Sequence, residues 1–259
     1  MKKAIKFIMI ICVALFFLGL CVQIFMGFRN YYRTRELLQK IKNEDSYKVK
    51  ELLDAGVNPN KTDVPPSKLW NFLETSPNRP LVVACRTGNV EIVKVLIEYG
   101  ATAQPIEGTG WSPLRETLFY FQPDDVEIVK LLLQNGAGAE VESDENLVYV
   151  AAQMEPRVYD KTKANGTVFI GGYDEVTAKG ITDIIDVLIQ NGGNVNYTDG
   201  AGKTVLMISV ERENLYLTEY LVNMGCDISV TDNQGKTALD YARELGNEEL
   251  IAILSRGKL

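Results

Sequence analysis

The chain has 259 residues and a formal net charge of −7, with 27 basic side chains, 34 acidic ones and no histidine. The absence of histidine excludes Ser-His-Asp and Cys-His catalytic relays, histidine-ligated metals and an imidazole pH switch. Only carboxylate, lysine, tyrosine or thiol chemistry remains open. Hydrophobic residues make up 46% of the chain, but they are distributed unevenly.

The N-terminal segment is apolar enough to cross a membrane as a helix. Three lysines precede a nearly unbroken apolar stretch over residues 7–28, and about 20 residues suffice to span a bilayer. We predict that residues 1–28 form an uncleaved signal-anchor, a single transmembrane helix. A cleaved signal peptide is the main alternative, although Gly19-Leu20-Cys21 fits the small-residue cleavage pattern poorly. A lipoprotein is a third alternative, which is disfavoured because a leucine precedes that cysteine.

Charge suggests an orientation for this span and a class of partner for the rest. Three basic residues precede the span and Arg29, Arg33 and Arg35 follow it. The positive-inside rule compares basic residues on the two sides, and here the two counts are nearly equal. A very short basic N-terminus usually stays in the cytoplasm, so we expect the part of the chain that follows the span to lie outside it. Residues 29–259 hold 24 basic and 34 acidic side chains, because three basic and no acidic residues lie before them, and their net charge is −10. Such a domain is badly suited to phosphates, so we expect no nucleic-acid partner.

The remainder of the chain repeats with a period of 33 residues. Helix-like runs open at leucines spaced by 33, 33, 59 and 33 residues, namely Leu81, Leu114, Leu147, Leu206 and Leu239. Each unit closes with an apolar run and a glycine, namely Gly56, Gly100, Gly136, Gly192 and Gly225. Glycine at the end of a helix permits a left-handed C-cap. Each unit thus predicts two short helices, which bury their apolar stripes only by stacking on neighbouring pairs.

The residues of this repeat resemble the ankyrin-repeat family. Repeat starts match at Ser112-Pro113-Leu114 and Lys236-Thr237-Ala238-Leu239, and Thr87-Gly88-Asn89-Val90 fits the position between helices. Asp199-x-x-Gly202-x-Thr204 and Asp232-x-x-Gly235-x-Thr237 fit the turns between repeats. The resemblance covers residues 34–259 and implies an all-α solenoid of about six helix-turn-helix units, preceded by the transmembrane helix. The expected units are about 34–63, 78–107, 111–143, 144–199, 203–232 and 236–259.

Three features depart from the family pattern. The family's histidine after the opening leucine is replaced in five units, so we expect its hydrogen bonds to the turns to be missing and the stack to be held mainly by apolar packing; the replacements are Val82, Arg115, Val148, Met207 and Asp240. About eleven extra residues lie around 64–72. The 59-residue spacing contains an insertion of 26 residues in the fourth unit. We place it at 154–179, between the two helices, because Gly180 precedes Gly192 as Gly88 precedes Gly100.

The insertion has the pattern of a β-hairpin. Arg157-Val158-Tyr159 and Thr167-Val168-Phe169-Ile170 are strand-like, and Asn165-Gly166 is a strong hairpin turn signal. One interpretation is a tolerated loop on one face of the stack. The other is an arm for partner recognition or self-association, because ordered insertions in repeats tend to lie at functional faces.

Other motifs that could bind a ligand or take part in catalysis are better explained by the structure of the repeat. Gly202-Lys203-Thr204 and its copy 33 residues later lack the upstream glycine of a phosphate loop. No C-x-x-C motif exists, so no zinc site is expected; Cys85 is interpreted as a buried helix thiol and Cys226 as a turn thiol. The pairs Asp124-Asp125 and Glu248-Glu249 are expected to be solvated residues at helix starts. No catalytic residue, cofactor or metal site is predicted.

The concave groove of such a stack is the expected binding surface. Positions two, five and six after each opening leucine point toward it, and the hairpin adds two aromatic residues. Tyrosine, tryptophan and arginine are the types that anchor interfaces. For Phe119 and Tyr120 the alternative is packing beneath the three-residue extension before Asp125. The candidate partner-binding residues are Arg86, Trp111, Phe119, Tyr120, Tyr149, Tyr159, Phe169, Arg212 and Tyr241.

These observations lead to three hypotheses of function. The favoured one is a non-enzymatic, membrane-tethered ankyrin-repeat protein that binds another protein through its groove and hairpin. The second is an enzyme, for which the sequence offers no cluster of carboxylates and no pocket lysine. The third is a structural protein that self-associates through the hairpin and the membrane span.

Overall fold

The computed structural model describes residues 2–62, 78–105, 112–119, 125–138, 146–154, 157–159, 167–169 and 175–257. For residues 2–18, 20, 21, 24 and the two strands it describes the backbone alone. The extra residues around 64–72 lie outside this set.

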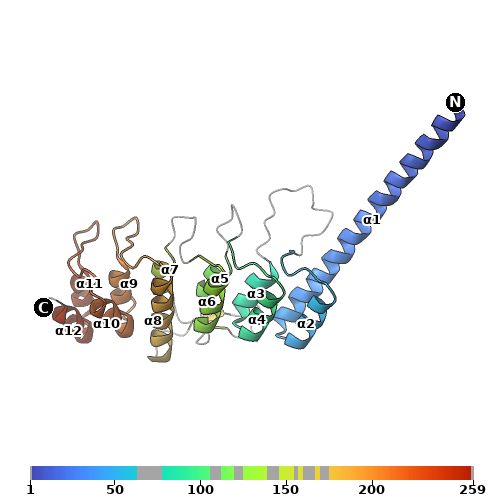
Figure 1. The fold of residues 1–259 in the computed structure, drawn as a ribbon. Coiled ribbons are helices and arrows are strands. Elements are labelled where there is room, and N and C mark those ends of the chain that lie inside the picture. Colours follow the sequence, from blue (N-terminus) through green and yellow to red (C-terminus); the bar gives the residue numbers. More distant parts are fainter. Residues whose placement is uncertain are drawn as a thin grey trace.

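Over these ranges the chain forms a row of six stacked helix pairs (Figure 1). The first helices of the pairs are α1 (Lys2–Lys42), α3 (Pro80–Thr87), α5 (Pro113–Phe119), α7 (Leu147–Ala152), α9 (Val205–Glu211) and α11 (Ala238–Leu245). The second helices are α2 (Ser46–Asp54), α4 (Val90–Glu98), α6 (Asp125–Gln134), α8 (Glu175–Gln190), α10 (Leu215–Asn223) and α12 (Glu248–Arg256). First helices contact first helices and second helices contact second helices, so the stack has two layers.

The ends of the helices follow from residues that recur in each unit. Helices α4, α10 and α12 each begin after an asparagine whose side chain accepts a backbone N–H, for example Asn89 from Ile92 and Asn214 from Leu217, both at 3.0 Å, and Asp45 does the same for α2. Such caps satisfy donors that have no partner within the helix. The closing glycines all have φ between 81° and 94°, a conformation that costs other residues energy. The predicted left-handed helix ends are therefore confirmed.

One continuous hydrophobic core runs through the stack. The opening leucines of α3, α5, α7 and α9 are at most 3% exposed, and the opening leucine of α11 is half-buried. The second helices contribute side chains with no exposed surface, among them Ile92, Ile128, Ile184 and Leu217. Each pair buries its stripe against its neighbours, as the stacking argument requires.

Helix α1 joins the N-terminal segment to the first repeat without interruption. It is 41 residues long, and its C-terminal part supplies the first helix of the first pair, with Thr34, Leu37 and Ile41 buried. Figure 1 shows its N-terminal half projecting away from the stack. Across the residues whose side chains are described, no helix is long and apolar enough to cross a membrane. The predicted span over 7–28 falls mostly on side chains outside that set.

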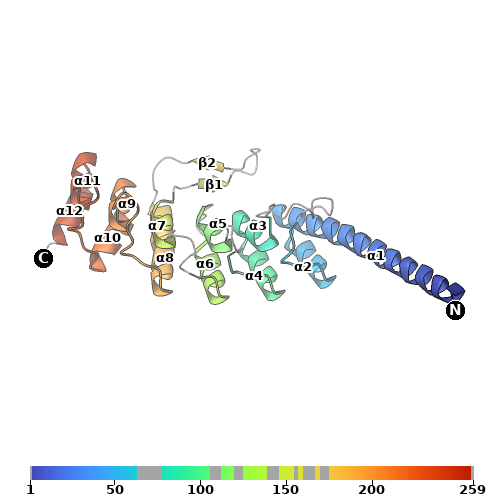
Figure 2. The same cartoon turned by 90° about the horizontal axis from the view of Figure 1, so that it is seen from above.

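Two short strands lie between α7 and α8. Strand β1 (Arg157–Tyr159) pairs antiparallel with β2 (Thr167–Phe169), with Val158 opposite Val168. These are the segments that the sequence indicates as strand-like, and the Asn165-Gly166 turn lies outside the described residues. Figure 2 shows both strands on the side of the first helices.

The equivalence drawn between Gly180 and Gly88 is wrong. Gly88 ends α3 with φ 66°, whereas Gly180 is a buried residue inside α8. Helix α8 begins at Glu175, within the range 154–179 assigned to the insertion, and reaches 16 residues. Glycine spacing was misleading because a glycine is also tolerated inside a helix, so the letter alone does not mark a helix end.

Candidate binding site on the first-helix face

Two turns that precede first helices are built on the same aspartate geometry. Asp199 Oδ1 accepts the backbone N–H groups of Ala201 at 2.9 Å and Lys203 at 2.8 Å. The residue 33 positions later, Asp232, does the same for Gln234 at 2.8 Å and Lys236 at 2.9 Å. An aspartate is suited to this because its carboxylate accepts several bonds at once. The carboxylates fix both turns before the helices begin.

Tyrosine hydroxyls tie these turns to the helices. Tyr149 on α7 donates to Asp199 Oδ2 and Tyr241 on α11 donates to Asp232 Oδ2, each at 2.5 Å. The first bond joins the fourth unit to the turn that precedes α9. The expectation that turn hydrogen bonds are missing without histidine is therefore wrong at these two turns. A tyrosine one position after the histidine slot reaches the turn instead.

The turns also bond to one another directly. Asn233 donates its backbone N–H to the carbonyl of Ala201 at 2.9 Å and its side-chain amide to that of Gly200 at 3.1 Å. At the other end of the stack Asn60 donates to the carbonyl of Gly100 at 2.8 Å. Hydrogen bonds thus connect successive units alongside the apolar core.

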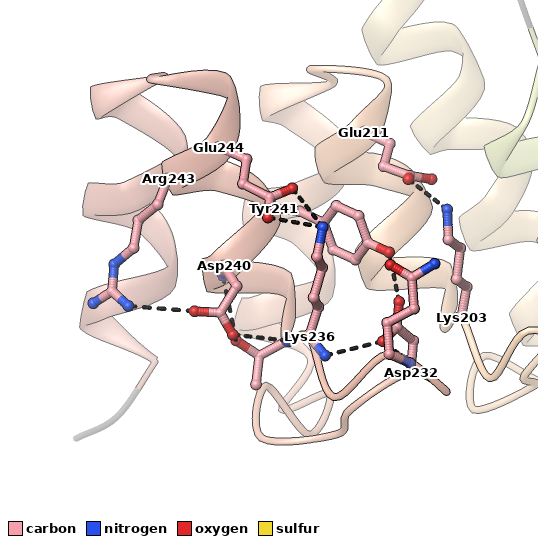
Figure 3. A network of polar contacts seen from close by, with 10 residues as sticks. Lys203, Glu211, Asp232, Lys236, Asp240, Tyr241, Arg243 and Glu244 are labelled. Atoms are coloured by element: carbon pink, nitrogen blue, oxygen red, sulfur yellow. Dashed lines mark hydrogen bonds and ion pairs between the residues drawn. The ribbon is translucent and has the colours of Figure 1, made fainter.

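Charged side chains surround Tyr241, whose ring lies between two lysines (Figure 3). The ammonium groups of Lys203 and Lys236 lie 5.1 Å and 5.4 Å from the ring centroid, a cation–π geometry. Lys203 is paired with Glu211 at 2.5 Å, and Lys236 with Glu244 at 2.8 Å. Because Lys203 comes from the preceding turn, this arrangement links the last two units.

These contacts shift the ionisation of the groups involved. The Tyr241 hydroxyl and the backbone N–H of Lys236 hold the pKa of Asp232 below its ordinary value. Burial alone would raise the pKa of Asp199, but the hydroxyl of Tyr149 and two backbone N–H groups outweigh it and lower that pKa. The pKa of Tyr149 is raised by burial and by its bond to Asp199. Both aspartates are thus held ionised, and the tyrosine keeps its proton.

An open pocket of about 340 Å³ lies between α7, α9 and the Asp199 turn. We call it the Tyr149–Arg212 pocket. Acidic and basic groups line its rim, and Ile208 supplies an apolar contact. Because the pocket combines an aromatic ring, an amide, both signs of charge and an aliphatic patch, it suits a mixed polar and apolar protein side chain. Its lining consists of Tyr149, Gln153, Asp199, Ala201, Lys203, Ile208, Glu211 and Arg212.

A second polar contact lies between α3 and α5. The Arg86 side chain donates to Glu116 at 2.5 Å; the arginine side chain is 25% exposed and the carboxylate 1% exposed. The residue before Glu116, Arg115, lies over the ring of Phe119, 4.9 Å from the centroid, and Phe119 is exposed. Arg86 therefore neutralises a buried carboxylate, and of these groups Phe119 offers the most open surface.

The structure groups some of the predicted partner-binding residues and separates others. Tyr149 and Arg212 meet in one pocket, whereas Tyr241 is a buried residue of α11 with little open surface. Trp111 and Tyr120 lie outside the described residues, and for Tyr159 and Phe169 only the backbone is described. Sequence reasoning missed Gln153, Asp199 and Lys203 as pocket residues. The sequence did carry a signal for two of them, because Asp199 and Lys203 recur 33 residues later as Asp232 and Lys236.

The remaining sequence candidates are accounted for by packing. Cys85 is buried, and desolvation raises the pKa of its thiol to about 12, so it is inert. Cys226 is half-buried after its glycine. Asp125 begins α6 but is fully buried, so its expected place as a solvated cap is wrong. Glu248 and Glu249 do lie exposed in the first turn of α12.

Comparison with known proteins agrees with this architecture. The chain matches the family model described as ankyrin repeats (3 copies) over residues 37–153 and 175–258. Among solved structures it is similar to the ankyrin repeat domain of human ASB11, with a TM-score of 0.62 and 20% identity over 86% of this chain and 83% of that one. No curated protein matches the chain. The family match spans most of the sequence and covers every helix pair, and the chain therefore belongs to the ankyrin-repeat family.

Proposed function

We propose that this protein is a non-enzymatic binding module that captures another protein on its first-helix face. Ankyrin repeats are generally protein-binding modules. The observation that carries the proposal is the Tyr149–Arg212 pocket, which opens beside two helices whose turn is fixed by Asp199. A pocket with a rigid wall lowers the ordering cost of binding. Arg86, Phe119 and Arg212 are the described candidates for partner contact, with Trp111, Tyr120, Tyr159 and Phe169 proposed from the sequence.

The hairpin extends the proposed surface. Its strands lie on the side of the first helices (Figure 2), so a partner in the pocket can meet both. We further propose that residues 1–28 tether the repeat domain, residues 34–259, to a membrane as a single-pass anchor, with the repeats outside the cytoplasm. This part rests on the apolar stretch over 7–28 and its basic flanks. Tethering raises the effective concentration of the module toward a partner at the same membrane.

Site-specific photocrosslinking tests the binding face. A photoreactive amino acid at Arg212 is expected to give a discrete adduct in cells, and one at Lys179, exposed on α8, is the matched control. Arg212→Glu should abolish an adduct formed from a probe at Gln153, because it reverses a charge in the pocket. Adducts of equal yield at Lys179 and Arg212 would refute the pocket as the binding site.

A self-assembling protein is the second candidate, favoured by the hairpin. A two-stranded sheet has two edges, and an edge strand is a template for pairing with another chain. Replacing residues 156–173 by a short glycine-serine link removes the strands and leaves α8 intact. Sizing of the detergent-solubilised protein decides: a smaller particle after deletion supports self-assembly, whereas unchanged size with lost partner capture supports the binding function.

A further inference from the structure

Helix α1 changes its environment abruptly where it leaves the stack. Thr34, Leu37 and Ile41 are at most 2% exposed, since they pack into the first unit. Immediately upstream, large apolar side chains are open to the surroundings: Val22 is 52% exposed, Phe25 70%, Met26 50%, Phe28 42% and Tyr32 61%. Folding into the repeat stack leaves this apolar surface uncovered.

These exposed side chains share one side of the helix. They follow spacings of three and four residues, which place them in one broad stripe. At about 100° per residue the buried stripe of Thr34, Leu37 and Ile41 falls on the other side. The polar Gln23 and Asn30 lie in line with that buried stripe. The apolar face of α1 thus points away from the direction in which the repeat domain packs.

Charged and aromatic residues lie at the C-terminal end of this apolar face. Arg29 and Arg35 are exposed beside it, and the rings of Tyr31 and Tyr32 lie 5.2 Å apart. Aromatic rings gather at membrane–water interfaces, and arginine is attracted to anionic headgroups. Arg33 is half-buried and donates to the carbonyl of Ala55 at 2.8 Å, which links α1 to the end of α2.

We propose that α1 passes through the surface of a bilayer that contains anionic phospholipids, with residues 22–28 at the end of the membrane span and residues 29–35 at the level of the headgroups, and that α1 is a rigid helix which holds the repeat stack at a fixed height above that surface. This rests on the proposed membrane tether. Continuity with the apolar residues 7–21 of the same helix favours lipid over a second protein, and the two exposed arginines favour anionic headgroups. Because α1 is one helix from Lys2 to Lys42, no flexible linker separates the interface from the core.

The connection is short enough to bring the first unit against the headgroups. Phe28 and Arg33 are five residues apart, about 8 Å along a helix. The turn of the first unit, residues 55–61, begins at the carbonyl that Arg33 contacts. Figure 1 shows α1 leaving on the side to which the turns project, with the last pair farthest from its N-terminal end. The first turn therefore lies near the lipid, and the last turn far from it.

Fluorescence quenching in vesicles tests this geometry. The full chain, carrying a fluorescent amino acid at Lys61 in the first turn, is reconstituted into vesicles of phosphatidylcholine and phosphatidylglycerol with a headgroup nitroxide quencher. The matched control has the fluorophore at Gln234, an exposed position of the last such turn. We expect at least threefold stronger quenching at Lys61. A twelve-residue glycine-serine insertion after Asn30 should remove this difference, and Arg29→Gln with Arg35→Gln should weaken quenching at Lys61 only when phosphatidylglycerol is present.

The outcomes separate the two proposals. Failure of the full chain to float with vesicles would refute the membrane tether itself. Flotation with equal quenching at both positions, or with quenching at Lys61 unchanged by the insertion, would refute the rigid helix while leaving the tether standing. Concentration-dependent crosslinking between copies at Phe25, with no response to lipid, would assign the apolar face to a second copy and overturn the proposal.

Discussion

Glu116 is a buried carboxylate that is paired with an arginine of the neighbouring unit. Its side chain is 1% exposed and lies 2.5 Å from the guanidinium of Arg86. Taking a charge out of water costs several kcal/mol, and an attraction of good geometry offsets that cost. Arg86, which the sequence predicts to contact a partner, thus also links α3 to α5.

Arg86→Ala is expected to destabilise the protein strongly. Removing the guanidinium leaves a buried carboxylate without its main countercharge, and we expect a loss of about 3 kcal/mol in the free energy of unfolding by urea. Arg243→Ala is the matched control, since its pair with Asp240 is exposed and should change stability by less than about 0.5 kcal/mol. The double variant Arg86→Met with Glu116→Leu should recover much of the loss. Equal losses of stability in Arg86→Ala and Arg243→Ala would contradict the role of Arg86 as the countercharge of Glu116.

The tie between Tyr241 and Asp232 makes stability depend on pH in acid. The pKa of Asp232 is lowered in the folded protein, so its contribution is present above its unfolded pKa of about 3.9 and is lost as pH falls through the lower folded pKa. Tyr241→Phe removes the largest cause of that shift. We therefore expect the melting temperature of the variant to lie below that of the unmodified protein at pH 7, and the gap to narrow below pH 4. A gap that is constant from pH 7 to pH 3 would show that the bond does not stabilise the ionised carboxylate.

At the scale of the element, α8 shows how an insertion is absorbed. The helix begins at Glu175 and its buried side chains run from Ala178 to Leu188. Its first turns extend past the length of the other second helices, and Val176 there is 64% exposed. The chain thus returns from the insertion to the repeat through the first turn of α8, which precedes the buried residues of that helix.

A pair of substitutions within α8 tests this division. Ile184 has no exposed surface, and Ile184→Ala should cost about 3 kcal/mol of unfolding free energy through lost burial and a cavity. Val176→Ala on the exposed first turn should cost less than about 0.5 kcal/mol. Urea denaturation followed by circular dichroism measures both. A large effect at Val176 would mean that the first turn of α8 is covered by part of the protein.

Elements could be predicted from the sequence where one physical cause repeats. The opening leucines recur at intervals of 33 residues apart from one of 59, and a left-handed glycine closes each of five units, so five weak motifs strengthen one another. Gly180 is the exception, because a glycine in the sequence is compatible both with a helix end and with a buried position inside a helix. The links from Tyr149 to Asp199 and from Lys203 to Tyr241 could not be predicted, since each joins residues of neighbouring units whose distance depends on the stacking itself.

At the scale of the whole molecule, the repeats are coupled in a line. Among the described helices the main contacts run between neighbouring pairs, so each unit depends on those beside it. The described turns add a second line of coupling through Asn60, Asn233 and the two lysines around Tyr241. A partner that binds the Tyr149–Arg212 pocket would therefore contact both the fourth and the fifth unit and stabilise their junction.

The missing histidines have a consequence for the charge state of the entire protein. No imidazole is present to titrate near neutrality. Among the described groups whose pKa is shifted, each shift is away from neutral pH. The pKa values of Asp199 and Asp232 fall, and those of Tyr149, Lys203 and Cys85 rise. We expect the melting temperature to vary by less than about 2 °C between pH 6 and pH 8, because few protons are exchanged on unfolding there. A steep slope in differential scanning calorimetry would contradict this. Binding by this surface should then be equally available in a neutral compartment and in a mildly acidic one.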